Sequence, residues 1–280
     1  MQRVLSTHLF INHTLHPGLL EIASRGGADA VEIFAARQHF DYTNRATVSE
    51  LGEWFRSTEL KPWSLHGPIF PDREMGRTGA PAINVVHPEK ARRIDGMDEL
   101  KRALETAEYI PFKYMVVHLG DNTDGWSQRT MEYASTALEH LGAFAAPLGV
   151  HLIIENLMSA ATTPEHLKLI LDMAHLGNIS ICLDLGHAHM TVGVAQAIES
   201  IGARTPSIHV HDNNGLKDEH LWPGDGAIDW QAAMTPLLAR DPQPAIVLEL
   251  SHGLAKDLNA IPDRVKKSFD FLNQYAPAVK

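Results

Sequence analysis

The stretch Ile179-Ser180-Ile181-Cys182-Leu183-Asp184-Leu185-Gly186-His187 contains an apolar run that ends in polar residues. Short apolar runs rich in isoleucine and leucine are typical of a buried β-strand. Helical periodicity precedes this run at Pro164–His175, where Thr163 caps a first-turn proline, and follows it at Val194–Ile201. The stretch therefore predicts a strand with a helix on either side in sequence, as in a parallel α/β sheet.

The same alternation of strand and helix extends over the chain in both directions. The predicted strands are Arg3–Phe10, Ala28–Ala35, Leu60–Gly67, Tyr114–Leu119, Val150–Leu157, Ile179–Leu185, Ser207–His211 and Ala245–Leu250. The predicted helices are Pro17–Arg25, Val48–Ser57, Glu89–Ile110, Ser127–Leu148, Pro164–His175, Val194–Ile201, Trp230–Ala239 and Leu258–Tyr275. Eight such units in 280 residues favour a closed parallel (β/α)8 TIM barrel, which typically needs about 250 residues.

Nothing in the sequence marks a second domain. No glycine-rich dinucleotide motif follows the first strand, and we find no linker or internal repeat. The longest irregular stretch is Phe70–Pro88 after the third predicted strand, and loops of this length often cover a functional site. We expect one TIM barrel domain over residues 1–280, with this loop as a lid.

Net charge, the length of apolar runs and the cysteine count limit which partners and which cellular compartment the sequence predicts. The formal net charge is −10, without a run of lysine and arginine that could follow a phosphate backbone, so nucleic acid is a disfavoured partner. No apolar run approaches the roughly 18 residues of a membrane span, and the amino terminus lacks a secretion signal. The one cysteine, Cys182, lies in an apolar run and is expected to be an inert core thiol. We expect a cytoplasmic protein that does not contact membranes.

The carboxyl ends of six predicted strands carry residues that bind metal ions. These residues are His66, His118, Glu155, Asp184 with His187, His209 and Glu249. In a barrel the carboxyl ends of the strands meet at one face and form the active site. Unpaired carboxylates beside apolar strands are costly to desolvate, and no lysine or arginine stands at these ends. The sequence therefore predicts a bound divalent cation, with Mn²⁺, Zn²⁺, Co²⁺ and Mg²⁺ all compatible with mixed carboxylate and imidazole ligands.

These residues resemble the xylose isomerase-like superfamily of barrels, which includes sugar isomerases, ketose 3-epimerases, inosose dehydratases and endonuclease IV. The resemblance runs over nearly the whole chain. Its most specific parts are the stretch Cys182–His187, the stretch His209–Asn213 and the stretch Pro223–Trp230.

The resemblance to the ketose epimerase branch implies one metal ion held by the last four strands. The matching ligands here are Glu155, Asp184, His209 and Glu249, and the two glutamates would also act as the catalytic acid/base pair. His187 would bond a substrate oxygen. Many epimerases have a substrate-binding arginine near the segment that here reads Lys217-Asp218-Glu219-His220, so this chain departs from them.

The endonuclease IV branch binds three zinc ions, and candidates for its additional ligands are also present. They are His66, His118, His187, Asp218 and His220, of which Asp218 and His220 lie closer in sequence to His209 than in that branch. The resemblance therefore implies one to three metal ions.

Several further residues near the predicted strand ends could support the site or touch a substrate. We expect His8 and Glu32 to form hydrogen bonds in the core or behind the metal ligands. His211 alternates with His209 along one strand, and we expect it to support the site or bind substrate. Phe70 and Trp222 lie in loops near the ligands and could stack on a substrate.

The sequence supports three classes of function. The first is a metal-dependent isomerase or epimerase that forms an enediolate from a small, unphosphorylated sugar or related polyol; a dehydratase of a keto-cyclitol begins in the same way. The second is a zinc-dependent phosphodiesterase acting on abasic DNA, with Ile69 and Phe70 as an apolar wedge. The third is a non-catalytic binding barrel in which the metal is structural. No feature of the sequence favours this third class. Barrels that this chain resembles often pair, so a homodimer is also expected.

Overall fold

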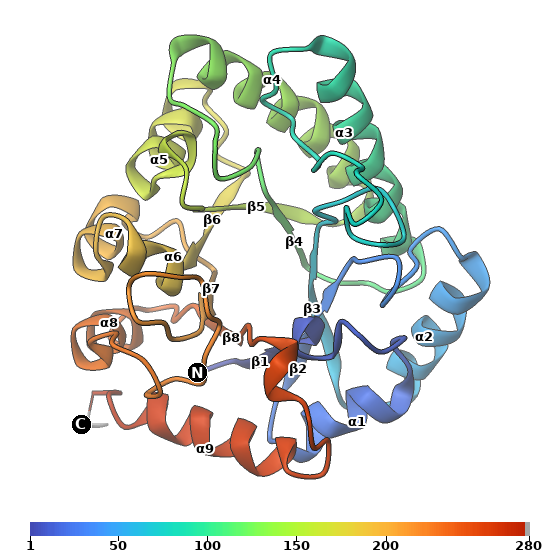
Figure 1. Cartoon of the computed structure of the whole chain (residues 1–280), viewed down its shortest axis with the longest axis vertical. Coiled ribbons are helices and arrows are strands. Elements are labelled where there is room, and N and C mark those ends of the chain that lie inside the picture. Colours follow the sequence, from blue (N-terminus) through green and yellow to red (C-terminus); the bar gives the residue numbers. More distant parts are fainter. Residues whose placement is uncertain (278–280) are drawn as a thin grey trace.

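The computed structural model describes residues 1–277, and its centre is a closed barrel of eight parallel strands (Figure 1). The strands are β1 (Arg3–Ser6), β2 (Ala30–Phe34), β3 (Lys61–His66), β4 (Tyr114–Val117), β5 (His151–Glu155), β6 (Ser180–Asp184), β7 (Ser207–Val210) and β8 (Ala245–Leu248). They follow chain order around the barrel, and β1 pairs with both β2 and β8. The predicted (β/α)8 TIM barrel is therefore confirmed.

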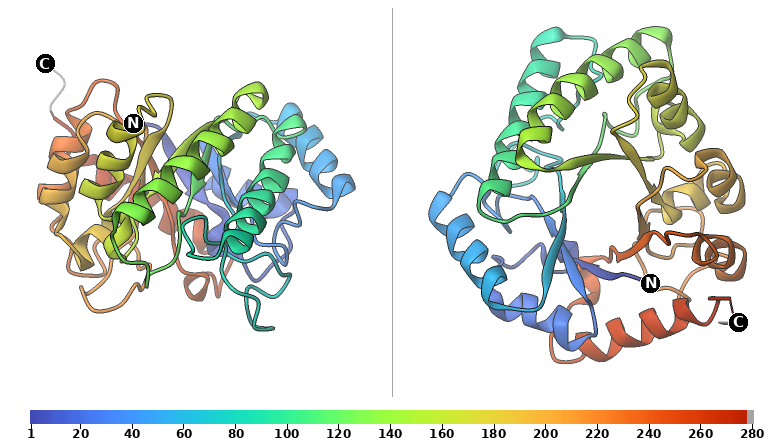
Figure 2. Two further views of the ribbon diagram at one scale, coloured as in Figure 1. Left: turned by 90° about the horizontal axis from the view of Figure 1, so that it is seen from above. Right: turned by 180° about the vertical axis from the view of Figure 1, so that it is seen from behind.

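Helices surround the strands on the outside, as the views in Figure 2 show. They are α1 (Pro17–Arg25), α2 (Arg45–Ser57), α3 (Lys90–Leu104), α4 (Gln128–Ala145), α5 (Pro164–Met173), α6 (Leu185–Met190), α7 (Val194–Ile201), α8 (Trp230–Leu238) and α9 (Ile261–Asn273). Short 3-10 helices occupy Thr7–Phe10, Glu105–Glu108, Ala146–Leu148, Ala160–Thr162 and His252–Leu254. Among the described residues, no helix combines the length and the apolar character needed to cross a membrane.

The starts of α5 and α8 have side-chain caps, and the first is the cap that the sequence predicts. The Thr163 side chain accepts a hydrogen bond from the backbone N–H of His166 at the start of α5. Asp229 accepts one from the N–H of Ala232 at the start of α8. Each cap satisfies a backbone donor that has no partner within the helix, so the boundaries at Pro164 and Trp230 are sharp.

The strands are shorter than predicted at their carboxyl ends, and this difference matters for function. The apolar run Arg3–Phe10 becomes β1 and a 3-10 helix at Thr7–Phe10. After β6 the chain turns directly into the short helix α6, which the sequence analysis did not predict. Residues predicted to end strands therefore lie just beyond them, in loops and helix starts.

The barrel interior is apolar at its amino-terminal end and polar at its carboxyl-terminal end. Val4, Ala30, Ala245 and Val247 form one apolar layer, against which Trp63 packs. The larger apolar core lies between the strands and the outer helices. The segment between β3 and α3 projects from the edge of the barrel opposite to the amino terminus (Figure 2, left).

Candidate metal centre

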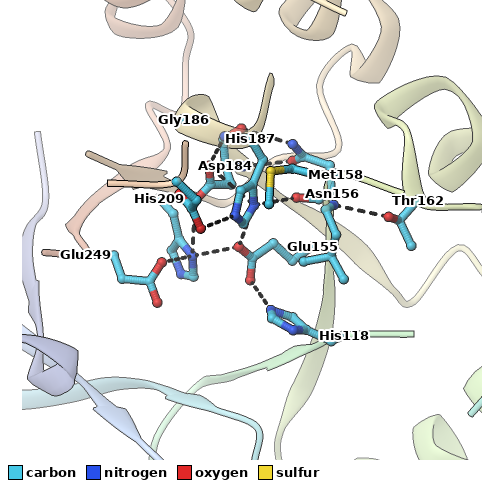
Figure 3. Close-up of polar contacts among 12 residues, drawn as sticks. His118, Glu155, Asn156, Met158, Thr162, Asp184, Gly186, His187, His209 and Glu249 are labelled. Atoms are coloured by element: carbon cyan, nitrogen blue, oxygen red, sulfur yellow. Dashed lines mark hydrogen bonds and ion pairs between the residues drawn. The ribbon is translucent and has the colours of Figure 1, made fainter. Parts of the chain in front are cut away.

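Four buried side chains that could bind a metal ion meet at the carboxyl end of the barrel, one from each of the last four strands. Glu155 ends β5, Asp184 ends β6, His209 lies in β7 and Glu249 directly follows β8. One donor atom from each of the four lies within 4.8 Å of the others, and all four residues are buried. Figure 3 shows these side chains converging from different strands. The structure thus brings together the four residues that the sequence analysis predicts to hold a metal ion.

His209 lies between this group and a buried carboxylate on the opposite side of the barrel interior. Its Nδ1 is 3.2 Å from Glu155 Oε1 and 3.2 Å from Glu249 Oε2. Its Nε2 is 3.2 Å from Glu32 Oε2, which also accepts a 2.8 Å hydrogen bond from the hydroxyl of Ser64. Glu32 therefore contacts the ligand from behind, as the sequence analysis expects, and leaves Nδ1 facing the metal group.

Two further histidines approach Glu155 from neighbouring strands. His118 Nε2 lies 3.0 Å from Glu155 Oε2, and His66 Nε2 lies 3.4 Å from the same oxygen. His66 donates its Nδ1–H to the carbonyl oxygen of Gly67 at 2.9 Å, so its Nε2 is the free ring nitrogen. His66, Glu155 and His209 form a second combination of donors within metal-binding distance of one another.

A separate group lies beside the first and is formed by α6 and the loop between β7 and α8. It contains His187, His211, Asp218 and His220. Asp218 Oδ2 lies 3.2 Å from His187 Nε2 and 3.1 Å from His220 Nε2. The shorter spacing from His209 thus does not keep Asp218 and His220 away from His187, because the loop folds back over the mouth.

Asn156, the residue after Glu155, connects the ends of β5 and β6 (Figure 3). Its amide donates to the Asp184 carbonyl at 3.0 Å and accepts from the Asp184 N–H at 2.8 Å. The carbonyl oxygen of Asn156 lies 2.9 Å from His187 Nδ1. These contacts fix Asp184 and His187 relative to Glu155.

Nearby histidines lower the pKa values of the two glutamates in the four-ligand group. Burial alone raises the pKa of Glu155, but nearby His209 and His118 hold it well below its ordinary value. For Glu249 the same competition between burial and the charges of His209 and His220 gives a pKa well below normal. Both glutamates are thus carboxylates, the form that binds metal ions.

A cavity of about 300 Å³ opens onto these residues. Its polar lining includes His66, His118, Glu155, His187, Asp218, His220 and Glu249. The lining also includes the apolar side chains of Phe34, Ile69, Phe70 and Ala82, so the predicted loop Phe70–Pro88 does border the mouth. A larger cavity of about 460 Å³ lies between α2 and α3, away from the strand ends, and contains none of these ligands.

The structure places the predicted substrate contacts in different surroundings. Phe70 and His187 line the cavity. Trp222 does not; it is buried in the core between barrel and helices, with the Arg264 guanidinium over its ring at 5.2 Å. His211 does not line the cavity either, because it lies beneath the surface between Gly186 and His220.

His211 and His8 have roles that the sequence did not reveal. His211 joins the second ligand group, although its alternation with His209 suggested a shared position on one strand. It lies one residue beyond the end of β7, where the strand geometry no longer applies. His8 lines the cavity beside Phe34 and His220, and burial lowers its pKa to about 3.

The donor set fits a divalent cation. Within residues 1–277, the ion pairs of Glu155, Asp184, Asp218 and Glu249 involve histidines and neither lysine nor arginine. Buried carboxylates clustered in this way require positive charge, and imidazole and carboxylate donors are ligands for Zn²⁺ and Mn²⁺.

The fold and the site together define a closed parallel barrel with a ring of imidazole and carboxylate groups at its mouth. A family model described as xylose isomerase-like TIM barrel matches residues 20–275. The chain therefore belongs to this family, as its resemblance predicted.

Curated relatives differ in their activities. The chain is 25% identical over 229 residues to inosose isomerase of Bacillus velezensis, covering 78% of this chain and 77% of that protein. It is 26% identical over 195 residues to probable endonuclease 4 of Natronomonas pharaonis, and the match covers 62% of this chain and 64% of that protein. Protein MJ1311 of Methanocaldococcus jannaschii is 30% identical over 152 residues, and the match spans about half of that protein, 52%.

Solved structures share the fold. A D-tagatose 3-epimerase-like protein superposes with a TM-score of 0.77 at 23% identity and covers 98% of this chain and 99% of its own. An IOLI protein with a binding zinc atom superposes with a TM-score of 0.78 at 20% identity, with the same coverage. These similarities support the barrel architecture independently of the sequence matches.

Proposed function

We propose that the chain is a divalent-metal-dependent isomerase or epimerase that acts through an enediolate on a small keto sugar or related polyol. The observation that carries this proposal is the pairing of Glu155 and Glu249. Both are buried carboxylates that face the same cavity and approach the same nitrogen, His209 Nδ1, from different strands. Inosose isomerase among the relatives supports the same class of reaction.

The chain's own residues supply the acid/base chemistry. Glu155, Asp184, His209 and Glu249 would hold the cation, which lowers the pKa of the C–H between adjacent substrate oxygens and favours the enediolate. One of the two glutamates removes the carbon-bound proton and keeps it as a carboxylic acid, and for inversion at that carbon the other glutamate first takes a proton from solvent water and then delivers it to the opposite face. Their low pKa values keep both unprotonated before substrate arrives, so either can act as the base.

The cavity lining supports an unphosphorylated substrate. Among the described residues that line it, none is lysine or arginine, so a phosphate group away from the cation would have no cationic side chain to bind it. Phe70 and Ile69 add apolar surface to the lining of the cavity, suited to the C–H face of a ring. We therefore expect neutral sugars and cyclitols to be better substrates than their phosphates.

Solvent isotope exchange tests the proposal. The metal-loaded protein is incubated in deuterated water with keto sugars and inososes, and deuterium incorporation at carbon is measured by mass spectrometry. We expect exchange with at least one neutral polyol and a loss on the order of 100-fold or more in Glu155→Gln, the range that general acid–base groups contribute. Glu99→Gln is the matched control, because Glu99 is a buried glutamate on α3 that bonds Tyr42 and does not line the cavity of the site. Absence of exchange across the panel with metal bound would contradict the proposal.

A second candidate is a phosphodiesterase acting at abasic sites in DNA. It is favoured by the ligands beyond the first four, namely His66 and His118 beside Glu155 and the separate group around Asp218. Several clustered cations suit phosphoryl transfer, and probable endonuclease 4 is among the relatives. Robust cleavage of an abasic-site oligonucleotide that is lost in Glu155→Gln would reverse our ranking.

A further inference from the structure

We propose that His8 donates a hydrogen bond from Nε2 to a substrate oxygen that the cation does not hold, and that it thereby selects substrates with a hydroxyl or carbonyl group at that position. The inference rests on the proposed function and deepens it, because it concerns recognition of the polyol in the same cavity. It is carried by the state of the two ring nitrogens of His8 and by the contacts that hold the ring at the cavity.

The chain that follows β1 places His8 at the cavity. After Ser6 it turns into the 3-10 helix Thr7–Phe10, and the Ser6 hydroxyl accepts a hydrogen bond from the His8 N–H at 3.4 Å. The hydroxyl of Thr7 accepts another from the Phe34 N–H at 2.9 Å, which ties this short helix to the end of β2. The imidazole of His8 therefore lies in the lining of the cavity beside Phe34.

Aromatic neighbours hold the ring of His8 in this place. Its centroid lies 4.8 Å from the centroid of Phe34 and 5.2 Å from that of His220. Phe34 is itself stacked on His66, with 4.4 Å between centroids and 22° between ring planes. Turning the His8 ring away from the cavity would lose these contacts, so its position is set by the packing around it.

His8 differs from the other histidines of the mouth in having free hydrogen-bonding capacity. Its Nδ1 is buried without a hydrogen-bond partner, and its Nε2 also has none among residues 1–277 but is accessible at the cavity surface. Within the same residues, His8 belongs to none of the groups of donors that could hold a metal ion. A carboxylate oxygen lies within 3.4 Å of a ring nitrogen in each of His66, His118, His187, His209, His211 and His220.

The surroundings of the two nitrogens decide which of them carries the proton. Burial favours the neutral imidazole, which has one N–H and one lone pair. A proton on Nδ1 of His8 would leave a buried donor without an acceptor, and buried donors without a partner are rarer in proteins than acceptors without one. A proton on Nε2 meets water or a ligand in the cavity. His8 therefore faces the cavity as a donor.

This tautomer is the reverse of the one that a metal ligand needs. His66, His187 and His220 donate Nδ1–H to backbone carbonyls and present the lone pair of Nε2. His8 presents an N–H at the same ring position, which suits an oxygen acceptor and not a cation. A polyol or keto sugar carries such oxygens beyond the adjacent pair at its reacting carbon. An analogue that lacks the matching oxygen would leave the donor unpaired and should bind more weakly.

A packing role beside Phe34 is the alternative for His8, and the two roles respond differently to substitution. His8→Phe keeps an aromatic ring but removes the donor, and His8→Leu removes both. His8→Gln removes the ring but places an amide N–H near the position of Nε2. Recognition of an oxygen predicts that only the glutamine variant discriminates between substrates, whereas packing predicts that only the phenylalanine variant resembles the wild type.

The experiment measures binding to the zinc-loaded protein by isothermal titration calorimetry. The probes are D-fructose and myo-inositol, each with its set of monodeoxy analogues. The matched control is His166→Phe, because His166 is stacked on Trp126, as His8 lies beside Phe34, but does not line the cavity. Metal content and thermal melts verify that each variant keeps its ion and its fold.

We expect the loss of one particular hydroxyl to weaken binding by about tenfold or more in the wild type and in His166→Phe, in the range for an unpaired donor. In His8→Phe and His8→Leu the parent polyol should bind about tenfold more weakly, and the same analogue should bind within about threefold of it. His8→Gln should discriminate against that analogue. The proposal is overturned if neither parent probe binds, if no analogue shows this pattern, if His8→Phe discriminates as the wild type does, or if the His8 variants lose the ion.

These outcomes are separate from those that test the isomerase proposal. Deuterium exchange at carbon without discrimination that depends on His8 overturns only the role of His8. Discrimination that depends on His8 without exchange in any polyol overturns only the isomerase reaction, because binding of the probes requires no chemical step.

Discussion

At the scale of single residues, the histidine rings of the mouth are oriented by what their second nitrogen contacts. His66, His187 and His220 each donate Nδ1–H to a backbone carbonyl and present Nε2 to the carboxylates. His209 is reversed, with Nε2 directed to Glu32 and Nδ1 to the four-ligand group. A carboxylate behind a ligating imidazole fixes its tautomer and raises its basicity.

We therefore expect Glu32→Gln to lower the affinity for the ion of the four-ligand group. An amide can bond His209 Nε2 but lacks the negative charge, so the loss should be about 10–100-fold in the dissociation constant. Chelator competition measures it, with Glu99→Gln as the control for replacing a buried glutamate elsewhere. An unchanged affinity in Glu32→Gln would mean that Glu32 serves only the packing of the barrel interior.

At the scale of elements, one buried carboxylate organises the loop between β7 and α8. Asp212 Oδ1 accepts from the N–H groups of Asn213 and Ile228, and Oδ2 accepts from Gly224 N–H and the Trp230 indole. The stretch Pro223–Trp230, recognised in the sequence as a motif, thus wraps around Asp212. Leu221 pairs with Asp212 through two backbone hydrogen bonds, which brings the preceding His220 and Asp218 to the mouth.

Asp212→Asn should destabilise the protein by roughly 2–4 kcal/mol, because an NH₂ group would then face two N–H donors in a buried site. Urea denaturation measures the free energy of unfolding. Asp229→Asn in the same loop is the matched control, since asparagine caps a helix about as well as aspartate does. Equal stability of the two variants would show that the loop does not depend on Asp212.

At the scale of the whole molecule, protons and metal ions would compete for the same histidine nitrogens at the mouth of the barrel. Burial alone would lower the pKa of His187 and His220, but nearby carboxylates, including Asp184 and Asp218, raise these values to about 10 and about 9. In an unfolded chain histidine titrates near 6.5. The metal-free folded protein therefore retains protons that the unfolded chain releases.

The raised pKa values of His187 and His220 should stabilise the metal-free protein fully below about pH 6.5. This contribution to the free energy of unfolding should be lost as pH rises through 9 to 10. Added zinc requires the deprotonated rings, so its stabilising effect should grow over the same range. Thermal melts from pH 6 to 10, with chelator and with zinc, measure both trends. A metal-free melting temperature that rises across this range would contradict the assignment.

The sequence by itself determined the barrel and most of the candidate metal ligands. Alternation of apolar runs and helical periodicity fixes the order of elements, because each strand must be covered by a helix to bury its apolar side. Polar residues at the ends of apolar strands identify Glu155, Asp184, His209 and Glu249, since parallel strands bring their carboxyl ends to one face.

Only the tertiary structure decided which side chains contact these four residues from behind and which further side chains lie beside them. Glu32 and His209 are 177 residues apart, and only closure of the barrel places them in contact. Loop folding around Asp212 brings Asp218 to His187, and the missing side chain of Gly186 admits His211. Such contacts depend on ring orientation and loop path beyond the strands, where neither strand nor helix periodicity constrains a side chain.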